Sequence, residues 1–299
     1  MRIFWTGVMP AITTPFKEDL SIDHEFLARH CAWLVESGCT AIVTPGSLGE
    51  GGTLTLEEKI SLWKTCRDAV GNRVPIVAAI SALSTTEAVM LAQHAVDSGC
   101  SGLMVLPPYV YRGDWREMKA YVGAIFRSTD LSCMLYNNPI AYGTDFLPEH
   151  IQELAAEHEN LHAVKESSAD VRRITAIRAL IGDRLAISVG VDDAIIEGVR
   201  AGAVGWIAGL ANAFPKESAT LFQYAIKRED AKASELNKWF LPLLRMDTVP
   251  KFVQLIKLVQ QDVGMGNARV RPPRMELVSD EFDRARATIR IALQTRPSL

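Results

Sequence analysis

The sequence predicts an α/β protein: a (β/α)8 TIM barrel with a C-terminal helical extension. Short apolar segments alternate with amphipathic helical patterns, and about eight such units follow one another over roughly the first 220 residues. Beyond them only helical patterns occur. Short apolar strands between helices are typical of a parallel sheet, and eight units favour a closed barrel. A doubly wound sheet is the alternative, but no GxGxxG turn follows the first strand.

A repeated junction supports this prediction. In three segments a helical pattern stops at a glycine and a short apolar strand follows at once: 37–43, 98–105 and 201–207. Each of these strands opens into a loop that contains glycine or proline. Glycine is the usual residue just beyond a helix C-terminus, so we predict a helix-to-strand turn at all three places.

The remaining elements follow from hydrophobic periodicity. Strands are predicted near residues 7–12, 75–80, 132–136, 161–165 and 185–190. Helices separate the strands, for example at 56–70, 85–97 and 170–181. Three further helices are predicted over 224–244, 249–263 and 280–293, with breaks at 264–266 and 271–273. We therefore divide the chain into a barrel (1–223) and a helical block (224–299) packed on the barrel or on a neighbouring subunit.

The composition is that of an ordinary globular protein, with 48% hydrophobic residues, 22% charged residues and a net charge of −3. The absence of a basic cluster argues against a nucleic-acid partner, and the absence of a long apolar run argues against a membrane span. Residues 1–7 lack a signal-peptide pattern. The five cysteines are odd in number and far apart, so we expect free buried thiols and a cytoplasmic location.

Lys165 is the first candidate for chemistry, because it ends an apolar strand. A period of two predicts Leu161, Ala163 and Lys165 on one strand face. A buried ammonium is costly, and a neutral lysine amine is a nucleophile for carbonyl carbon. The alternative is a lysine whose head reaches water at the strand end.

Other polar residues follow predicted strands, where the chemistry of a TIM barrel lies. Residues 46–52 contain four glycines, whose backbone N–H groups either bind an anion or form a flexible turn. Tyr136 shares its strand face with Ser132 and Met134, so it should point into the barrel, as an active-site or a core tyrosine. Gly190 closes the seventh strand.

Four segments together resemble one family. They are the opening 7–16, the Gly-x-x-Gly-Glu loop at 46–50, the Tyr-Asn-x-Pro sequence at 136–139 and the lysine strand at 161–168. In this order, over nearly the whole chain, the sequence resembles the dihydrodipicolinate synthase / N-acetylneuraminate lyase family. Its members are lysine-dependent class I aldolases, dehydratases and deaminases.

The resemblance implies roles for the residues at these positions. Lys165 would form an imine with the 2-oxo group of a pyruvate-like acid, so that no cofactor and no metal are needed. Tyr136 would act as acid and base, and Ser47 would join it in a proton relay. The backbone amides of Ser47 and Leu48 would hold the substrate carboxylate. A protonated imine is an electron sink that makes carbanion chemistry at C3 accessible.

Further roles concern substrate contact and assembly. Ile207, through its carbonyl, and Gly190 are expected to contact the substrate. Tyr109, or Tyr111 two residues on, would reach into a neighbour's site, which implies a homotetramer built as a dimer of dimers. Glu50 is expected to accept hydrogen bonds from backbone N–H groups rather than to act in catalysis.

The chain also departs from the family pattern. Dihydrodipicolinate synthases carry an arginine shortly after Tyr-Asn-x-Pro, where this chain has Ala141, and a second loop hydroxyl where it has Leu48. Without the arginine, the carboxylate of aspartate semialdehyde loses its partner. We therefore expect a catabolic lyase, such as a 1-pyrroline-4-hydroxy-2-carboxylate deaminase or a 2-keto-3-deoxy sugar acid aldolase or dehydratase. A 4-hydroxy-tetrahydrodipicolinate synthase and a non-catalytic 2-oxo acid sensor are the alternatives.

A metal-dependent aldolase is less favoured. The six histidines form no HxH or HExxH pair, and Asp192 and Asp193 are adjacent, so on a strand their side chains would point to opposite faces. A phosphate site at 205–209 is also disfavoured, because the large Trp206 lies within that segment.

Overall fold

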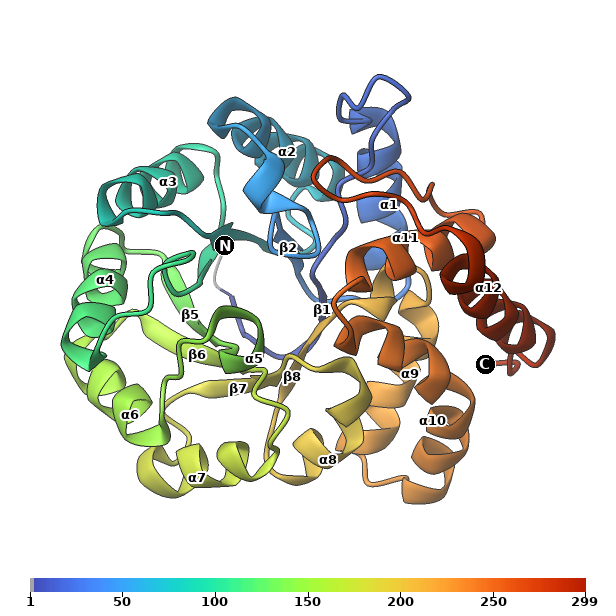
Figure 1. The fold of residues 1–299 in the computed structure, drawn as a ribbon. Coiled ribbons are helices and arrows are strands. Elements are labelled where there is room, and N and C mark those ends of the chain that lie inside the picture. Colours follow the sequence, from blue (N-terminus) through green and yellow to red (C-terminus); the bar gives the residue numbers. More distant parts are fainter. Residues whose placement is uncertain (1–2) are drawn as a thin grey trace.

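The computed structural model describes residues 3–299 and contains one eight-stranded parallel sheet. The strands are β1 (Gly7–Pro10), β2 (Ile42–Thr44), β3 (Ile76–Ile80), β4 (Gly102–Val105), β5 (Ser132–Asn137), β6 (Leu161–Glu166), β7 (Ala186–Val189) and β8 (Gly205–Ala208). Their order is β1-β8-β7-β6-β5-β4-β3-β2, and a parallel bridge between Ala11 and Val43 joins the two ends. The sheet is therefore a barrel, which confirms the predicted TIM-barrel fold (Figure 1).

Helices surround the strands and continue into a C-terminal block (Figure 1). The helices of the barrel are α1 (His24–Glu36), α2 (Leu56–Val70), α3 (Thr85–Asp97), α4 (Trp115–Arg127), α5 (Pro139–Tyr142), α6 (Pro148–Glu157), α7 (Arg172–Ile181), α8 (Ile195–Arg200) and α9 (Pro215–Ile226). The block contains α10 (Asp230–Leu244), α11 (Phe252–Asp262) and α12 (Ser279–Gln294). Capping side chains fix several helix starts: in α2, for example, Thr55 and Glu58 form a capping box.

The three predicted helix-to-strand junctions are present. Gly38, Gly99 and Gly202 follow helices α1, α3 and α8, and they have φ values of +100°, +78° and +113°. Only glycine adopts such values without steric cost, and this explains why the same residue recurs at each junction.

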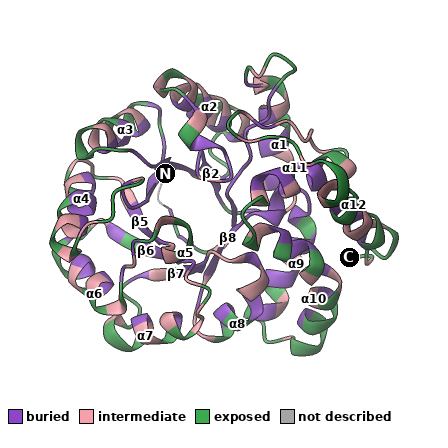
Figure 2. Ribbon diagram, in the orientation of Figure 1, coloured by how far each residue is buried: buried purple, intermediate pink, exposed green. Residues whose placement is uncertain are grey.

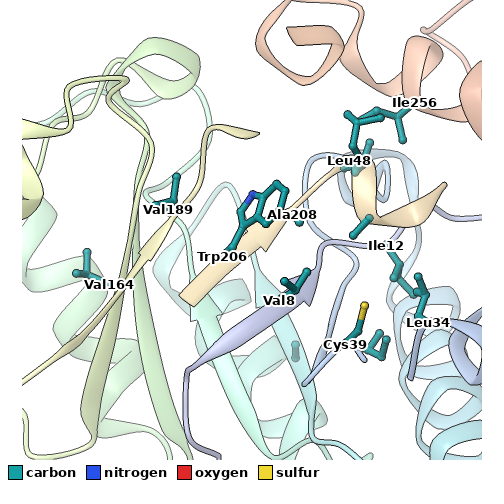
Figure 3. Packing of buried hydrophobic residues seen from close by; sticks show 14 of the residues in the cluster. Val8, Ile12, Leu34, Cys39, Leu48, Val164, Val189, Trp206, Ala208 and Ile256 are labelled. Carbon is teal, nitrogen blue, oxygen red and sulfur yellow. The ribbon is translucent and has the colours of Figure 1, made fainter. Parts of the chain in front are cut away.

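Two apolar layers stabilise the barrel. One fills its interior and includes Val43, Met104 and Met134. The other lies between strands and helices, and includes Val8, Val164, Val189 and Trp206 (Figure 3). Burial accordingly concentrates on the strands and on the inner faces of the helices (Figure 2).

The face predicted for β6 is wrong at its start. Ala163 belongs to the interior layer, but Leu161 belongs to the outer layer. The cause is a register shift in the pairing with β5, where Cys133 pairs with Leu161 and the next residue, Met134, pairs with Ala163. An irregularity of this kind breaks the period of two that the sequence predicts.

The predicted helix over 224–244 is also wrong, because the chain turns between α9 and α10. Arg228 has φ +59° within this turn, although residues 227–229 contain neither glycine nor proline. The turn lets α10 fold back against α9. As a result, the boundary drawn at residue 223 falls inside α9.

The C-terminal block is held to the barrel by a buried ion pair. Glu50, in the loop after β2, accepts hydrogen bonds from Lys257 Nζ at 2.5 Å and from the backbone N–H of Arg271 at 2.9 Å. Burial lowers the pKa of Lys257 to about 8, against the opposing effect of Glu50. Glu50 is thus a structural acceptor, as predicted, and it fixes the loop that carries Ser47 to α11.

Candidate active site

A pocket of about 640 Å³ opens at the C-terminal ends of the strands. Its lining comes from two parts of the fold. The barrel contributes Ser47, Leu48, Tyr136, Lys165, Gly190 and Ile207, among others, and the C-terminal block contributes residues that include Asp247, Phe252 and Arg274. The pocket therefore lies where TIM barrels carry their chemistry, and the block forms part of its wall.

Lys165 lies on β6 and is 7% exposed. It pairs in register with Tyr136 on β5, and its Nζ lies 4.0 Å from the centroid of the Tyr136 ring. Since the side chain also lines the pocket, the amine is buried in the protein yet faces a space that a ligand can enter. The alternative of a lysine head in open water does not fit this burial.

Gly190 supports the aliphatic stem of Lys165. A methyl group built on Gly190 would overlap Ser167 Oγ and would lie 2.5 Å from Cε and 2.8 Å from Cγ of Lys165. The backbone N–H of Gly190 donates to the carbonyl of Glu166 at 2.9 Å, which fixes the end of β7 against β6. Glycine is thus needed here because the side chains of Lys165 and Ser167 both pass directly over its backbone.

Tyr136 is 5% exposed and belongs to the interior apolar layer, as its strand position predicts. Its hydroxyl accepts a hydrogen bond from Asn138 Nδ2 at 3.0 Å. Asn138 also caps α5 by accepting the backbone N–H of Ala141. The cap therefore positions the phenol hydroxyl and starts the short helix together.

Ser47 meets a different tyrosine from the one predicted. Its hydroxyl forms a short hydrogen bond with the hydroxyl of Tyr142, and no direct hydrogen bond joins Ser47 to Tyr136 among residues 3–299. The rings of Tyr136 and Tyr142 pack edge to face with centroids 5.8 Å apart. Helix α5 brings Tyr142 back over the end of β5. The Tyr142 hydroxyl therefore bonds Ser47, where the prediction had the hydroxyl of Tyr136.

Tyr142 is one of the pocket residues to which the sequence analysis gave no role. Burial raises the pKa of Tyr142, and the neighbouring Tyr136 and Tyr109 raise it further. A signal was present in the asparagine and proline that start a one-turn helix, because such a helix returns its last residue toward the strand.

Tyr109 packs within its own chain, with its ring centroid 5.8 Å from that of Tyr142. Burial raises the pKa of Tyr109, whereas hydrogen bonds with Ser81 and Ser47 oppose the rise. Tyr111 is exposed and donates to Glu117 at 2.9 Å. A role for either tyrosine in a neighbour's site stays a prediction.

Leu48 and Ile207 both line the pocket, but their side chains pack in different apolar layers. The side chain of Leu48 belongs to the outer apolar layer together with Ile256 (Figure 3). Ile207 belongs to the interior layer and pairs with Met9 across β8 and β1. The chemical groups that these two residues can offer to a polar ligand are those of their backbones.

The position of the missing arginine is apolar in the structure as well. Ala141 lines the pocket, next to Ile140. The arginine that does line the pocket is Arg274, from the C-terminal segment, and its Nη1 lies 3.9 Å from Glu50 Oε2. Sequence reasoning did not single out Arg274, because nothing local to residue 274 places it at the strand ends.

Two neighbouring carboxyl groups, those of Asp192 and Asp247, lie near the ends of β7 and β8, and Asp192 is fully buried behind the pocket wall. Asp192 accepts hydrogen bonds from Trp206 Nε1 at 2.8 Å and from the backbone N–H groups of Gly209 and Leu210. Burial raises the pKa of Asp192 to about 6, although these bonds oppose the rise. Asp247 lines the pocket beside this network. Within the described part of the chain, no cluster of histidine, cysteine, aspartate or glutamate is arranged to bind a metal ion.

Comparison with known proteins agrees with this geometry. The sequence model of the dihydrodipicolinate synthetase family matches residues 5–292. The match therefore covers both the barrel and the buried lysine, and it places the protein in a known class of lyases. The chain belongs to the dihydrodipicolinate synthetase family, and it is a class I lyase of the Schiff-base-forming type.

Similar proteins include two 4-hydroxy-tetrahydrodipicolinate synthases. The one from Chelativorans sp. (strain BNC1) is 33% identical over 238 residues, which cover 79% of this chain and 81% of the relative. The one from Agrobacterium fabrum (strain C58 / ATCC 33970) is 30% identical over 280 residues, which cover 93% of this chain and 95% of the relative.

Solved structures show the same fold. The 4-hydroxy-tetrahydrodipicolinate synthase from Methylacidiphilum fumariolicum SolV has a TM-score of 0.93 at 26% identity, with 97% of this chain and 96% of that chain covered. The dihydrodipicolinate synthase from Acinetobacter baumannii complexed with pyruvate has a TM-score of 0.92 at 27% identity, covering 97% and 99%. None of the helices formed by residues 3–299 has the length and apolar character that a bilayer span requires.

Proposed function

We propose that this lyase acts on a pyruvate-like 2-oxo acid through an imine on Lys165, without a separate cofactor. One observation carries the proposal: the Lys165 amine is buried, faces the pocket and lies over the ring of Tyr136. An amine attacks a ketone only in its neutral form, and the place of Lys165 in the pocket wall brings its amine within reach of a bound ketone. The pyruvate complex of the Acinetobacter baumannii relative supports a substrate of this kind.

The surrounding groups have roles that follow from their positions. The phenol of Tyr136 exchanges protons as the amine adds to the ketone and water leaves, because it lies beside the Lys165 amine. The backbone N–H groups of Ser47 and Leu48 bind the substrate carboxylate, since both residues line the pocket. Tyr142, bonded to Ser47, extends the chain of hydroxyl groups that carries these protons.

A further question is what the substrate contains beyond its pyruvyl unit. The names of the relatives favour 4-hydroxy-tetrahydrodipicolinate synthase, in which pyruvate condenses with aspartate semialdehyde. The pocket supports a catabolic lyase, because Ala141 stands where an arginine would bind the carboxylate of aspartate semialdehyde. We propose the catabolic reaction, on a 2-keto-3-deoxy sugar acid or on 1-pyrroline-4-hydroxy-2-carboxylate, with the synthase as the second candidate.

The imine is tested by trapping. Protein incubated with pyruvate and borohydride should gain one reduced adduct, and peptide mass spectrometry should place it on Lys165. Lys165→Ala should lose both the adduct and turnover while its circular dichroism spectrum stays unchanged. Activity of Lys165→Ala within tenfold of wild type would contradict the proposal. Loss of activity with EDTA, without any adduct, would favour a metal-dependent lyase instead.

The substrate is tested by a panel. Purified protein is assayed with pyruvate plus aspartate semialdehyde, with 2-keto-3-deoxy sugar acids and with 1-pyrroline-4-hydroxy-2-carboxylate. We expect kcat/KM for a catabolic substrate to exceed that for the condensation by at least tenfold. The reverse order would identify a synthase, and binding without turnover of any of them would identify a sensor.

A further inference from the structure

Asp247 places a carboxyl group at the active site that the roles described so far do not use. It lies in the 3-10 turn η4 (Arg245–Thr248), which connects α10 to α11, and it lines the pocket. A methyl group built on Gly209 would lie 2.4 Å from Asp247 Oδ1, so the carboxyl packs directly on the backbone at the end of β8. The C-terminal block thus contributes an acid to the mouth of the barrel.

Tyr136 and Asp247 lie on different sides of Lys165. Strand β6, which carries Lys165, is flanked by β5 with Tyr136 and by β7, and β8 follows β7 in the ring. Asp247 rests on the residue after β8. A substrate held on the Lys165 amine therefore has a phenol on its β5 side and a carboxyl on its β8 side.

The hydrogen bonds and charges around Asp192 and Asp247 decide which of these two carboxyl groups keeps a proton. Asp192 accepts hydrogen bonds from three N–H donors, and these stabilise its carboxylate. Burial and the negative charge of Asp192 raise the pKa of Asp247, and the positive charge of Lys165 partly opposes this rise. Two close carboxyl groups in a buried site resist being ionised together, so the proton resides on Asp247.

We propose that Asp247 is the acid that protonates the C4 oxygen of the substrate, on the side of the imine remote from Tyr136. The assignment rests on the proposed imine chemistry of Lys165. The unused carboxyl, its place in the pocket and its contact with Gly209 are the observations that carry it.

The step balances for a dehydration and for an aldol condensation. After the imine loses a C3 proton, the enamine holds the electron pair. In a dehydration this pair expels the C4 oxygen, which takes the proton of Asp247 and leaves as water. In an aldol condensation the pair forms the C3–C4 bond, and the aldehyde oxygen takes the same proton to become a hydroxyl. Asp247 ends as a carboxylate in both cases and regains a proton from water.

The test separates chemistry at C3 from chemistry at C4. Exchange of the pyruvate methyl protons in D2O, followed by NMR, needs only the imine and the enamine. Turnover of the fastest reaction in the substrate panel, including condensation of pyruvate with aspartate semialdehyde or glycolaldehyde, also needs the C4 oxygen. For Asp247→Asn, which keeps the shape but cannot donate an acidic proton, we expect the ratio of turnover to exchange to fall at least thirtyfold.

Asp193→Asn is the matched control, because Asp193 also lines the pocket but pairs with Arg245 at 3.7 Å. Its ratio should stay within threefold of wild type. An Asp247→Asn ratio within threefold of wild type would overturn the assignment, as would wild-type exchange without any reaction at a C4 oxygen. A wild-type protein that forms no pyruvate adduct fails earlier, and that result removes the proposed function itself.

Discussion

At the scale of single residues, the site depends on where side chains are absent as much as on where they are present. Lys165 reaches the pocket because Gly190 has no Cβ in its path. Tyr136 keeps its orientation because Asn138 bonds its hydroxyl and caps the next helix at the same time. These are local devices with effects that can be measured one substitution at a time.

Gly190→Ala should reduce the rate of pyruvate adduct formation by roughly 100-fold. The new methyl group would overlap Cε of Lys165, and a displacement of about 1 Å of a reacting group is enough for a loss of this size. The atoms it meets are flexible side-chain atoms, so the melting temperature should change little. A variant that forms the adduct at the wild-type rate would show that the lysine does not need this path.

Tyr136→Phe should lower kcat by more than tenfold, since general acid–base groups typically contribute ~10²–10⁴ in rate. The ring that packs against Lys165 Nζ is retained, so only the proton transfer is removed. Stopped assays with the best panel substrate measure the effect. An unchanged kcat would exclude Tyr136 from proton transfer.

At the scale of elements, buried polar contacts tie helices to the strand ends. His30 on α1 is fully buried, and its Nε2 donates to the carbonyl of Asn212 at 2.9 Å. Asn212 in turn donates to the carbonyl of Ala11. The network joins α1, the loop after β8 and the loop after β1, and Ala11 also lines the pocket.

The free energy of unfolding should therefore depend on pH through His30. Burial lowers the pKa of His30 to about 4, below its ordinary value of 6.5. Below pH 6.5 the imidazole of His30 binds a proton in the unfolded chain but not in the folded chain. The stability that neutral His30 contributes is therefore fully present above pH 6.5 and is lost as the pH falls toward 4. The loss from this group between pH 7 and pH 5 is about 2 kcal/mol.

Urea unfolding at the two pH values measures this loss, and His30→Gln removes the titrating group. The difference in unfolding free energy between pH 7 and pH 5 should shrink by about 2 kcal/mol in this variant. An unchanged difference would show that His30 is not the group responsible.

At the scale of the whole molecule, the barrel and the C-terminal block form one active site. The block supplies Asp247, Phe252 and Arg274 to the pocket wall, and Lys257 binds Glu50 in the loop that carries Ser47. Removing either part would open the pocket and would leave buried charge without a partner.

Lys257→Met should destabilise the protein by about 3–5 kcal/mol, because it leaves the fully buried Glu50 carboxylate without its nearest cation. Adding Glu50→Gln should restore part of that loss, since the uncompensated charge is then gone. Chemical denaturation of both variants tests the coupling. A double variant no more stable than Lys257→Met would mean that the two side chains act independently.

The predicted homotetramer concerns the surface beside the pocket. Leu83, Val110 and Ile140 are 67%, 92% and 72% exposed, and they follow the neighbouring strands β3, β4 and β5. Large apolar side chains exposed after neighbouring strands favour an interface at this end of the barrel. Light scattering should give the mass of four chains, and Val110→Asp should shift it to a smaller assembly.

Ile291→Asp on α12 is the control for this substitution, because Ile291 is also exposed but lies on the C-terminal block. It should leave the mass unchanged. A monomeric wild-type protein would contradict the predicted assembly.

Much of the fold and part of the site follow from the sequence alone. The barrel, the three glycine junctions and the strand-end positions of Lys165 and Tyr136 follow from local patterns, because strand and helix periods and glycine φ values are properties of short segments. The turn at Arg228 and the shifted register at Leu161 could not be read, since packing between elements sets both.

The order of amino acids along the chain was sufficient for the barrel, for the lysine at its mouth and for the absence of the expected arginine. Only the folded molecule revealed that Tyr142 bonds Ser47, that Gly190 lies under Lys165 and that Asp247 and Arg274 line the pocket. The reason is physical: these contacts join segments far apart in the chain, and the closure of the barrel and the docking of the C-terminal block bring them together.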